Sequence, residues 1–343
     1  MTHRPSTLHP SIAFLRLCRC TAAAALVVAA AGEARAATFT LDDPDHDVVG
    51  AIQVTHAVAG ETLLDIARRH DLGLNEITAA NPGVDAWVPG DGRRVVLPTR
   101  FVLPPGPRTG IVINLGQMRL FYFPRDSRGQ PVRVVTHPIG IGVEYDATPL
   151  GSTSVVRKAH LPTWHPPESI RKKRAAAGEI LPASVPPGPD NPLGEYALYL
   201  GFTSYLVHGT NRPWGIGMRV SGGCIRMYPE DIESLYPQVP VGTPVRIIEQ
   251  GYAVGRLRGV PYLQVFANAS ATAEEGESHT PLVEALLGSV PRGAIDWDRV
   301  MRAATARRNL ALPITPRSPT LDQLITAAPR VARPGEESEK VKR

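Results

Sequence analysis

The sequence is short of cysteine: three occur in 343 residues, at positions 18, 20 and 224. Cys18 and Cys20 lie in an N-terminal segment that we expect to be removed. Cys224 is then the single cysteine of the mature chain, which excludes an internal disulfide. Long hydrophobic runs are missing too. The apolar stretch from Thr21 to Ala31 is far shorter than the roughly 30 Å hydrocarbon core of a bilayer requires.

The first 36 residues are typical of an export signal. Arg4, Arg16 and Arg19 precede the apolar stretch, and Ala34-Arg35-Ala36 is a small-x-small cleavage site. No twin arginine is present, and the two early cysteines lie on the wrong side of the apolar run for lipidation. We therefore expect a cleaved signal peptide over residues 1–36, with an uncleaved membrane anchor as the alternative.

The chain also has only a small excess of charge of one sign. The formal net charge is +5, but residues 1–36 carry four arginines against Glu33, so the mature chain is close to +2. This small excess argues against a nucleic-acid partner, which requires a strongly basic surface. The basic run from Arg171 to Arg174 predicts either a solvated loop or helix face, or a contact with an anionic polymer.

Proline is abundant, with 34 residues, and it limits long helices while favouring turns and edge strands. Many short strands separated by proline- and glycine-rich turns indicate a mainly-β domain, sandwich-like or barrel-like, over residues 110–249. The expected strands cover residues 110–115, 118–123, 132–135, 154–157, 196–200, 205–208 and 245–248. Pro229 is expected to open a helix. Residues 159–194 predict a long loop or lid over an active site.

The flanking segments add small helical parts, so the expected fold class is α+β. Residues 38–53 indicate an extended, weakly structured leader. Residues 54–98 predict a strand, two short helices and a closing strand, with Thr62 capping the first helix.

The C-terminal part begins with a flexible linker over residues 264–281. A helical extension follows over residues 282–327, whose second helix places Trp297, Val300, Met301 and Ala304 on one face. A disordered tail is expected over residues 330–343.

Cys224 lies sixteen residues after His208, on a loop that contains Gly222 and Gly223. A cysteine nucleophile needs thiolate character, access and donors for an oxyanion. The glycines leave room for a bulky acyl donor, and Ser221, Gly222 and Gly223 form the loop whose N–H groups face the developing charge. We expect His208 to remove the thiol proton, with a backbone carbonyl orienting its ring, since no acidic partner is evident. A buried structural thiol is the alternative.

Residues 54–98 resemble a LysM domain. The residues that carry this resemblance are Val58-x-Gly60-Glu61-Thr62-Leu63-x-x-Ile66-Ala67, Ile77-x-x-Ala80-Asn81-Pro82, and Val88-Pro89-x-x-x-Arg93-x-Val95-Val96-Leu97-Pro98. LysM modules bind N-acetylglucosamine polymers, so the resemblance implies a peptidoglycan-binding domain. A structural cap on the next domain, without a ligand, is the alternative.

The region from Gly110 to Glu249 resembles the L,D-transpeptidase catalytic domain of YkuD type, in the branch of ErfK, YbiS, YcfS and YnhG. The matching residues are His208-Gly209-Thr210-Asn211, Gly215-Ile216-Gly217-Met218-Arg219-Val220-Ser221-x-Gly223-Cys224-Ile225-Arg226-Met227, Pro138-Ile139-Gly140-Ile141-Gly142, Thr148-Pro149-x-Gly151 and Pro186-Pro187-Gly188-Pro189-x-Asn191-Pro192-Leu193-Gly194.

This resemblance implies an acyltransferase without cofactors that works in the periplasm. Cys224 would attack the bond between residue three and D-alanine of a peptidoglycan tetrapeptide stem, with His208 as its base. The acceptor amine is either another stem's diamino acid or the lysine of an outer-membrane lipoprotein. Two alternatives remain open, a hydrolase of the same fold and a non-catalytic wall-binding protein.

Further residues are candidates for substrate contact or for structural roles. Arg226 binds either a substrate carboxylate or Asp231 or Glu230. Trp164 is a candidate lid residue that lines the substrate cleft. Trp214 either lines the cleft or packs in the core. Many relatives have histidine where this chain has Gly222. A metal site at His160, His165 and Glu168 is not expected, because their spacing has no regular geometry. His137 is expected to be structural.

Overall fold

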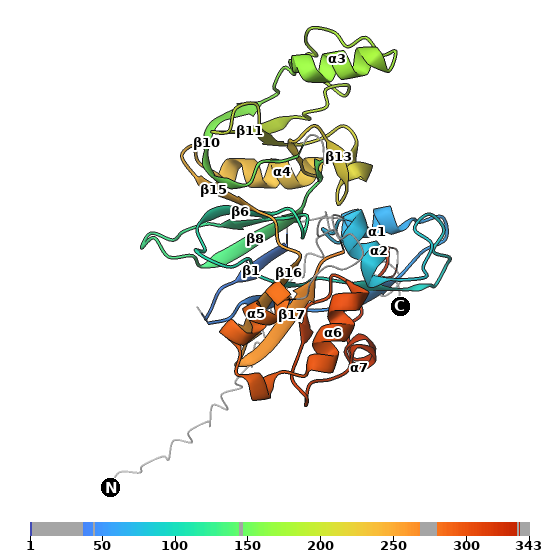
Figure 1. Cartoon of the computed structure of the whole chain (residues 1–343), viewed down its shortest axis with the longest axis vertical. Coiled ribbons are helices and arrows are strands. Elements are labelled where there is room, and N and C mark those ends of the chain that lie inside the picture. The colour runs from blue at the N-terminus through green and yellow to red at the C-terminus, as the bar shows by residue number, and fades with distance from the viewer. Residues whose placement is uncertain (2–36, 44, 144–146, 268–279, 335, 337–343) are drawn as a thin grey trace. The chain divides into compact units, whose positions relative to one another are not determined.

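A curved, nine-stranded sheet forms the centre of the computed structural model (Figure 1). The structure describes residues 1, 37–43, 45–143, 147–267, 280–334 and 336, and those from 37 onward belong to one compact unit. The predicted signal peptide therefore lies outside the described residues. Within them, no helix has the length and apolar character needed to cross a membrane.

The central sheet is mixed, with β15 parallel to β6 and β14 parallel to β12, and its other pairs antiparallel. Its strands in spatial order are β1 (Ala37–Thr40), β8 (Arg133–Pro138), β7 (Arg119–Phe123), β6 (Gly110–Asn114), β15 (Pro244–Ile248), β10 (Gly151–His160), β11 (Tyr196–Leu200), β12 (Leu206–His208) and β14 (Ile225–Arg226). Strand β10 joins the two halves, because its first residues pair with β15 and its last with β11.

At β6 and β7 both faces of the sheet are buried, which explains why these strands contain few polar residues. Successive side chains of a strand point to opposite faces. Ile111 and Ile113 therefore join one core, which includes α4 (Pro229–Leu235), whereas Phe121 and Phe123 join a second core. The strands predicted over residues 110–115 and 118–123 are confirmed as β6 and β7, which form a hairpin with Asn114 opposite Arg119.

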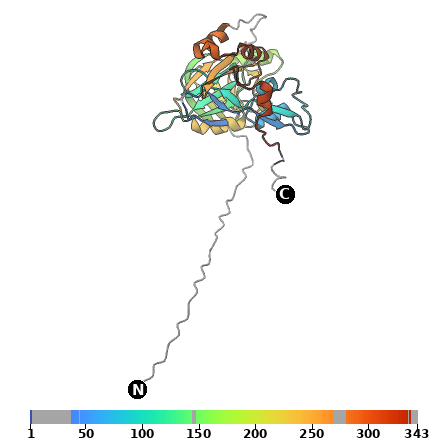
Figure 2. The same cartoon turned by 90° about the horizontal axis from the view of Figure 1, so that it is seen from below.

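The second core is completed by the segment with the LysM-like sequence. This segment forms β3 (Gln53–His56), α1 (Leu63–Arg69), α2 (Leu74–Ala80) and β4 (Arg94–Leu97), the predicted element order. We call it the βααβ unit. Thr62 caps α1 as predicted, accepting the Asp65 N–H at 3.2 Å. Leu63, Ile66 and Ile77 pack with Phe121 and Phe123 of the sheet, and α1 and α2 lie beside it in Figures 1 and 2.

The expected unstructured leader over residues 38–53 is wrong. Residues 37–40 form β1, which pairs with β8 at the edge of the central sheet. Residues 48–50 form β2 (Val48–Gly50), which pairs with β5 (Arg100–Val102). Both strands are short and have partners far away in sequence, so local sequence patterns gave no sign of them.

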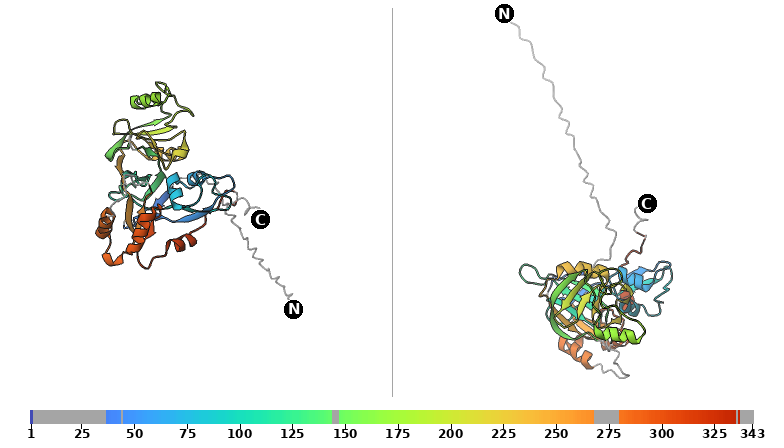
Figure 3. Two further views of the ribbon diagram at one scale, coloured as in Figure 1. Left: turned by 45° about the vertical axis from the view of Figure 1, so that its right-hand side comes forward. Right: turned by 90° about the horizontal axis from the view of Figure 1, so that it is seen from above.

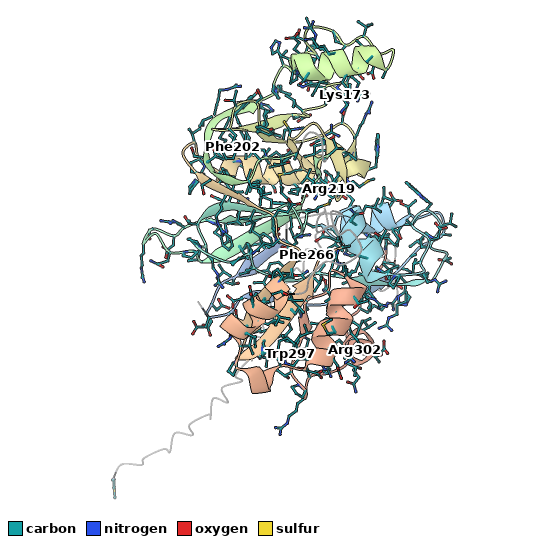
Figure 4. The ribbon with its side chains drawn as sticks, viewed as in Figure 1. Lys173, Phe202, Arg219, Phe266, Trp297 and Arg302 are labelled. Carbon is teal, nitrogen blue, oxygen red and sulfur yellow. The ribbon has the colours of Figure 1, made fainter. Side chains whose placement is uncertain are left out.

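The C-terminal part contains a small sheet in addition to helices. A hairpin of β16 (Tyr252–Leu257) and β17 (Val260–Val265), together with β18 (Leu312–Pro313), was not predicted. Helices α5 (Thr280–Ser289), α6 (Trp297–Ala306) and α7 (Leu321–Thr326) gather on this side of the chain (Figures 1 and 3). Val300 and Ala304 are buried and Trp297 packs beside them (Figure 4). Met301 is 41% exposed, so its predicted place on the apolar face is wrong.

Two predicted irregular segments are partly ordered. Gln264 is buried in β17 and accepts the Val102 N–H at 2.9 Å, so the predicted linker does not begin there. Residues 268–279 of that linker lie outside the described residues. The predicted tail also begins too early, because the Val331 N–H donates to the Val54 carbonyl of β3 at 2.8 Å.

Candidate active site

Cys224 and His208 come from two neighbouring strand ends of the central sheet. Strands β12 and β14 are parallel, and His208 lies opposite Arg226. Cys224 directly precedes β14, two residues before Arg226. The parallel pairing therefore places the two residues that the sequence paired on neighbouring chain segments, which local patterns did not reveal.

His208 is 3% exposed and its ring is held by a backbone carbonyl, as predicted. Its Nδ1 lies 2.6 Å from the Gly209 oxygen. An Nδ1–H that donates to this carbonyl leaves Nε2 as the proton acceptor of the neutral ring. Burial is the main cause that lowers the pKa of His208 to about 4, and the positive charge of Arg226 lowers it further. The imidazole is therefore an uncharged base at neutral pH.

The Cys224 side chain is partly exposed, and its sulfur lies 3.6 Å from the Ser204 carbonyl. Burial raises the pKa of the Cys224 thiol above its ordinary value, although the charge of Arg226 acts in the opposite direction. The resting sulfur is thus a thiol, and it needs His208 to become a nucleophile.

The loop before Cys224 is fixed by side-chain hydrogen bonds. The Ser221 hydroxyl donates to the Cys224 carbonyl, a bond within the loop. Thr148 donates to the Gly223 carbonyl at 2.8 Å and accepts the Gly142 N–H at 3.3 Å. Sequence reasoning missed Thr148 as a site residue. The feature that could have identified it is its hydroxyl, which lies in the segment Thr148-Pro149-x-Gly151 that resembles a family motif.

The geometry of the loop suits an oxyanion. Gly223 has a φ of +96°, a conformation that a residue with a side chain rarely adopts. In the hydrogen-bond network of the described residues, the N–H groups of Gly222, Gly223 and Cys224 have no acceptor. Backbone donors that are free beside a nucleophile are what a tetrahedral oxyanion requires.

Arg226 is a free guanidinium beside this loop. Its expected alternative partners are occupied elsewhere, because Glu230 pairs with Arg68 at 2.7 Å and Asp231 lies against His137. Arg226 makes no ion pair within the part of the chain that the structure describes, and its Nε is buried without an acceptor. The predicted ion pair of Arg226 with Asp231 or Glu230 is therefore wrong, and the guanidinium is available to a substrate carboxylate.

The predicted lid contains a helix, α3 (Glu168–Ala176), that the sequence did not predict (Figure 1). No side chain of α3 is fully buried, and its basic residues, Lys173 among them (Figure 4), are exposed. Ile170 reaches the catalytic loop, since a Cβ on Gly222 would lie 3.2 Å from its Cδ1 atom. The basic run is thus the solvated helix face that the sequence favoured.

The two predicted tryptophans occupy different places. Trp164 is partly exposed on the lid and bridges to Val185. Trp214 is 60% exposed and lines a pocket of about 240 Å³ with Leu64 and Arg68 of α1. It is therefore not a core residue. Of the residues considered for a metal site, His160 stacks on Tyr196 with 4.8 Å between the ring centroids, and Glu168 pairs with Lys172.

Comparisons with known proteins identify relatives of the chain. A model of the L,D-transpeptidase catalytic domain, YkuD, matches residues 108–247. The chain is 38% identical over 299 residues to the probable L,D-transpeptidase YbiS of Escherichia coli, covering 85% of this chain and 96% of that one. It is 43% identical over 230 residues to the probable L,D-transpeptidase YcfS of the same organism, covering 65% and 70%.

Solved structures are more distant. The crystal structure of L,D-transpeptidase 3 from Mycobacterium tuberculosis matches with 20% identity and a TM-score of 0.29, covering 46% of this chain and 75% of that one. A similarity of this size adds nothing to the sequence relationship.

Proposed function

The chain belongs to the YkuD family of L,D-transpeptidases, and from this premise we propose that it transfers peptidoglycan stem peptides through a thioester on Cys224. The observation that carries the proposal is the parallel pairing of β12 and β14, which places His208 opposite an unpaired Arg226 and close to the loop of Cys224. Together they supply a nucleophile, a neutral base and a guanidinium that is able to bind a substrate carboxylate.

The first half of the reaction forms the acyl-enzyme. His208 Nε2 takes the thiol proton as Cys224 Sγ attacks the carbonyl between the third residue and D-alanine of a tetrapeptide stem. The N–H groups of the glycine loop stabilise the oxyanion, and His208 passes its proton to the amine of D-alanine as the C–N bond breaks. D-Alanine leaves, and the tripeptide remains as a thioester.

The second half transfers the acyl group to an amine. His208 removes a proton from the acceptor amine, which attacks the thioester and returns Cys224 as a thiol. An acceptor on another stem's diamino acid gives a 3→3 cross-link. The lysine of an outer-membrane lipoprotein would instead give a protein–peptidoglycan bond. Both acceptors are amines, and the site residues named above do not distinguish them.

The remaining parts of the chain fit the same substrate. The βααβ unit has the sequence features of a LysM domain, so we assign it to binding the glycan strand. The export signal that the sequence predicts in residues 1–36 would take the protein to the periplasm, where peptidoglycan lies. Intact-mass measurement of the exported protein tests the cleavage. A mass that still contains residues 1–36 would contradict it.

The central test is the product pattern with tetrapeptide-bearing muropeptides. Cross-linked dimers or exchange of D-alanine, read by mass spectrometry, are expected for the transpeptidase. Tripeptide without dimer would identify a hydrolase. Cys224→Ala that still binds glycan, with no turnover by the parent protein, would leave a wall-binding protein without catalysis.

A covalent label tests the nucleophile separately. A carbapenem is expected to acylate Cys224 in the parent protein and to leave Cys224→Ala unmodified. An adduct on any other residue, or no adduct, would contradict the assignment of Cys224.

A further inference from the structure

A buried group of charged residues lies between the βααβ unit and the central sheet, outside the site at Cys224. It contains Asp71, which follows α1, Glu76 of α2, Arg119 of β7, His137 of β8 and Asp231 of α4. No side chain of the group is more than 5% exposed. Charged groups are rarely buried so deeply unless they are paired or bind an ion.

Arg119 and Glu76 satisfy each other within this group. Arg119 Nε donates to Glu76 at 2.9 Å, and the same guanidinium donates to Thr136 at 3.1 Å and to the Asp71 carbonyl. Glu76 also accepts the Gly73 N–H at 2.8 Å. The single guanidinium of the group is therefore matched by one carboxylate, and its distance to the Asp71 carboxylate is 3.9 Å.

The other three side chains lie close together, and each has at least one buried polar atom without a hydrogen-bond partner in the described structure. His137 is fully buried, and neither of its ring nitrogens has a hydrogen bond in the described structure. One carboxylate oxygen of Asp71 and one of Asp231 also lack a partner. His137 Nδ1 lies 3.3 Å from an Asp231 oxygen and 3.9 Å from an Asp71 oxygen. Unsatisfied buried atoms at this density point to a missing ligand.

We propose that Asp71, His137 and Asp231 bind a divalent transition-metal ion that joins the βααβ unit to the catalytic domain. Their ligand atoms lie within 4.8 Å of one another. Separations of 3.3 and 3.9 Å are suitable for atoms around one ion with bonds of about 2.0–2.2 Å. One imidazole nitrogen and two carboxylate oxygens form a donor set that Zn²⁺ accepts.

The charges of the group also favour a cation. Three carboxylates, Asp71, Glu76 and Asp231, face one guanidinium, so two negative charges are left when all are ionised and His137 is neutral. A divalent ion balances them. Protons are the competing way to balance the charge, since burial raises the pKa of Asp231 to about 8. The two cases differ in whether the purified protein contains metal.

The role of this ion is structural. Helix α4 begins at Pro229, shortly after the Arg226 strand, and two other contacts attach it to the βααβ unit. Arg68 pairs with Glu230 at 2.7 Å, and the Tyr228 hydroxyl donates to the Leu72 carbonyl at 3.1 Å. An ion bound by Asp231 and Asp71 would add a third link between the same two elements, and so help to hold the strand that follows Cys224.

The test is metal content and position in the mature chain from residue 37, made without a histidine tag. We expect about one Zn²⁺ per chain by mass spectrometry of the metal after incubation with Zn²⁺ during refolding, because the buried site takes up an ion as it folds. Crystals should show an anomalous peak at the zinc edge among Asp71, His137 and Asp231.

Variants assign the ion to these residues. Asp71→Asn and His137→Gln should weaken zinc binding by at least about tenfold, since even loss of an outer-shell partner costs that much. His165→Gln, on the exposed lid, is the matched control and should bind like the parent. Less than about 0.1 ion per chain in the refolded parent would overturn the proposal. An anomalous peak elsewhere would also overturn it, and neither result depends on the variants' folding.

Discussion

At Cys224 and His208, burial favours the uncharged form of both side chains. The pKa of His208 falls to about 4 and that of Cys224 rises above its ordinary value. The resting enzyme therefore contains a thiol and a neutral imidazole, which exchange a proton only when substrate is attacked. A preformed thiolate–imidazolium pair would need the opposite shifts.

Alkylation tests this protonation state. In the mature chain Cys224 is the single cysteine, so iodoacetamide labelling reports it alone. Because the thiolate is the reactive form and the thiol pKa is raised, the rate should increase about tenfold per pH unit between pH 6 and 8. A rate that is flat over this range would contradict the neutral pair. Cys224→Ala is the control for labelling elsewhere.

Arg226 is the second residue-scale prediction. Its unpaired guanidinium is expected to bind a carboxylate of the stem peptide, a charge-assisted bond worth about 1.5–3 kcal/mol. Arg226→Gln should therefore lower kcat/KM for tetrapeptide stems about tenfold to a hundredfold. Iodoacetamide labelling at high pH should change much less, because the label carries no carboxylate.

The control for this prediction is Lys172→Gln on α3, whose side chain is exposed and paired with Glu168. It should leave kcat/KM near that of the parent. Equal losses for both variants would assign the effect to general surface charge instead of to Arg226.

At the scale of elements, the catalytic loop depends on two glycines for different reasons. At Gly223 the reason is the backbone, which has a φ of +96°. At Gly222 the reason is space, because a Cβ added there would lie 3.2 Å from the Ile170 side chain. Gly223→Ala should cost about 1–2 kcal/mol and displace the loop, with a large loss of acylation by a carbapenem. Gly222→Ala should retain most acylation, because the end of the Ile170 side chain is able to move.

The double variant Gly222→Ala with Ile170→Ala separates space from backbone strain. It should acylate as fast as the parent, and thermal melts would show whether each variant is folded. If Gly222→Ala proved as slow as Gly223→Ala, and removal of the Ile170 side chain did not help, this explanation would be wrong.

At the scale of the whole molecule, the βααβ unit forms part of the enzyme's core. Leu63, Ile66 and Ile77 cover Phe121 and Phe123 of the central sheet. Each large apolar side chain contributes about 1.5–3 kcal/mol when fully buried, and a typical domain is stable by only about 5–15 kcal/mol. Exposure of this face would remove much of that stability.

A fragment of residues 108–250 should therefore aggregate, or melt far below the mature chain, although it contains every catalytic residue. The mature chain from residue 37 is the control. A cooperative melt of the fragment within a few degrees of that of the mature chain would show that the βααβ unit is dispensable for folding.

The sequence alone identified the candidate nucleophile, the candidate base and most of the elements. Local signals were sufficient there: alternation for β6 and β7, the cap at Thr62, proline at the start of α4, and a family motif around Cys224. The LysM assignment and the cleaved signal peptide stay predictions.

Only the tertiary structure decided which distant residues meet. Strand β1 was missed because its partner, β8, lies far away in sequence. The hairpin of β16 and β17 is different: its strands are joined by Arg258 and Gly259 alone, so the sequence analysis overlooked a local signal there. Partners far away in sequence also explain Arg226, whose freedom depends on Arg68 holding Glu230, and the buried group at His137. Burial and charge balance arise from contacts across the whole chain, so no local window contains them.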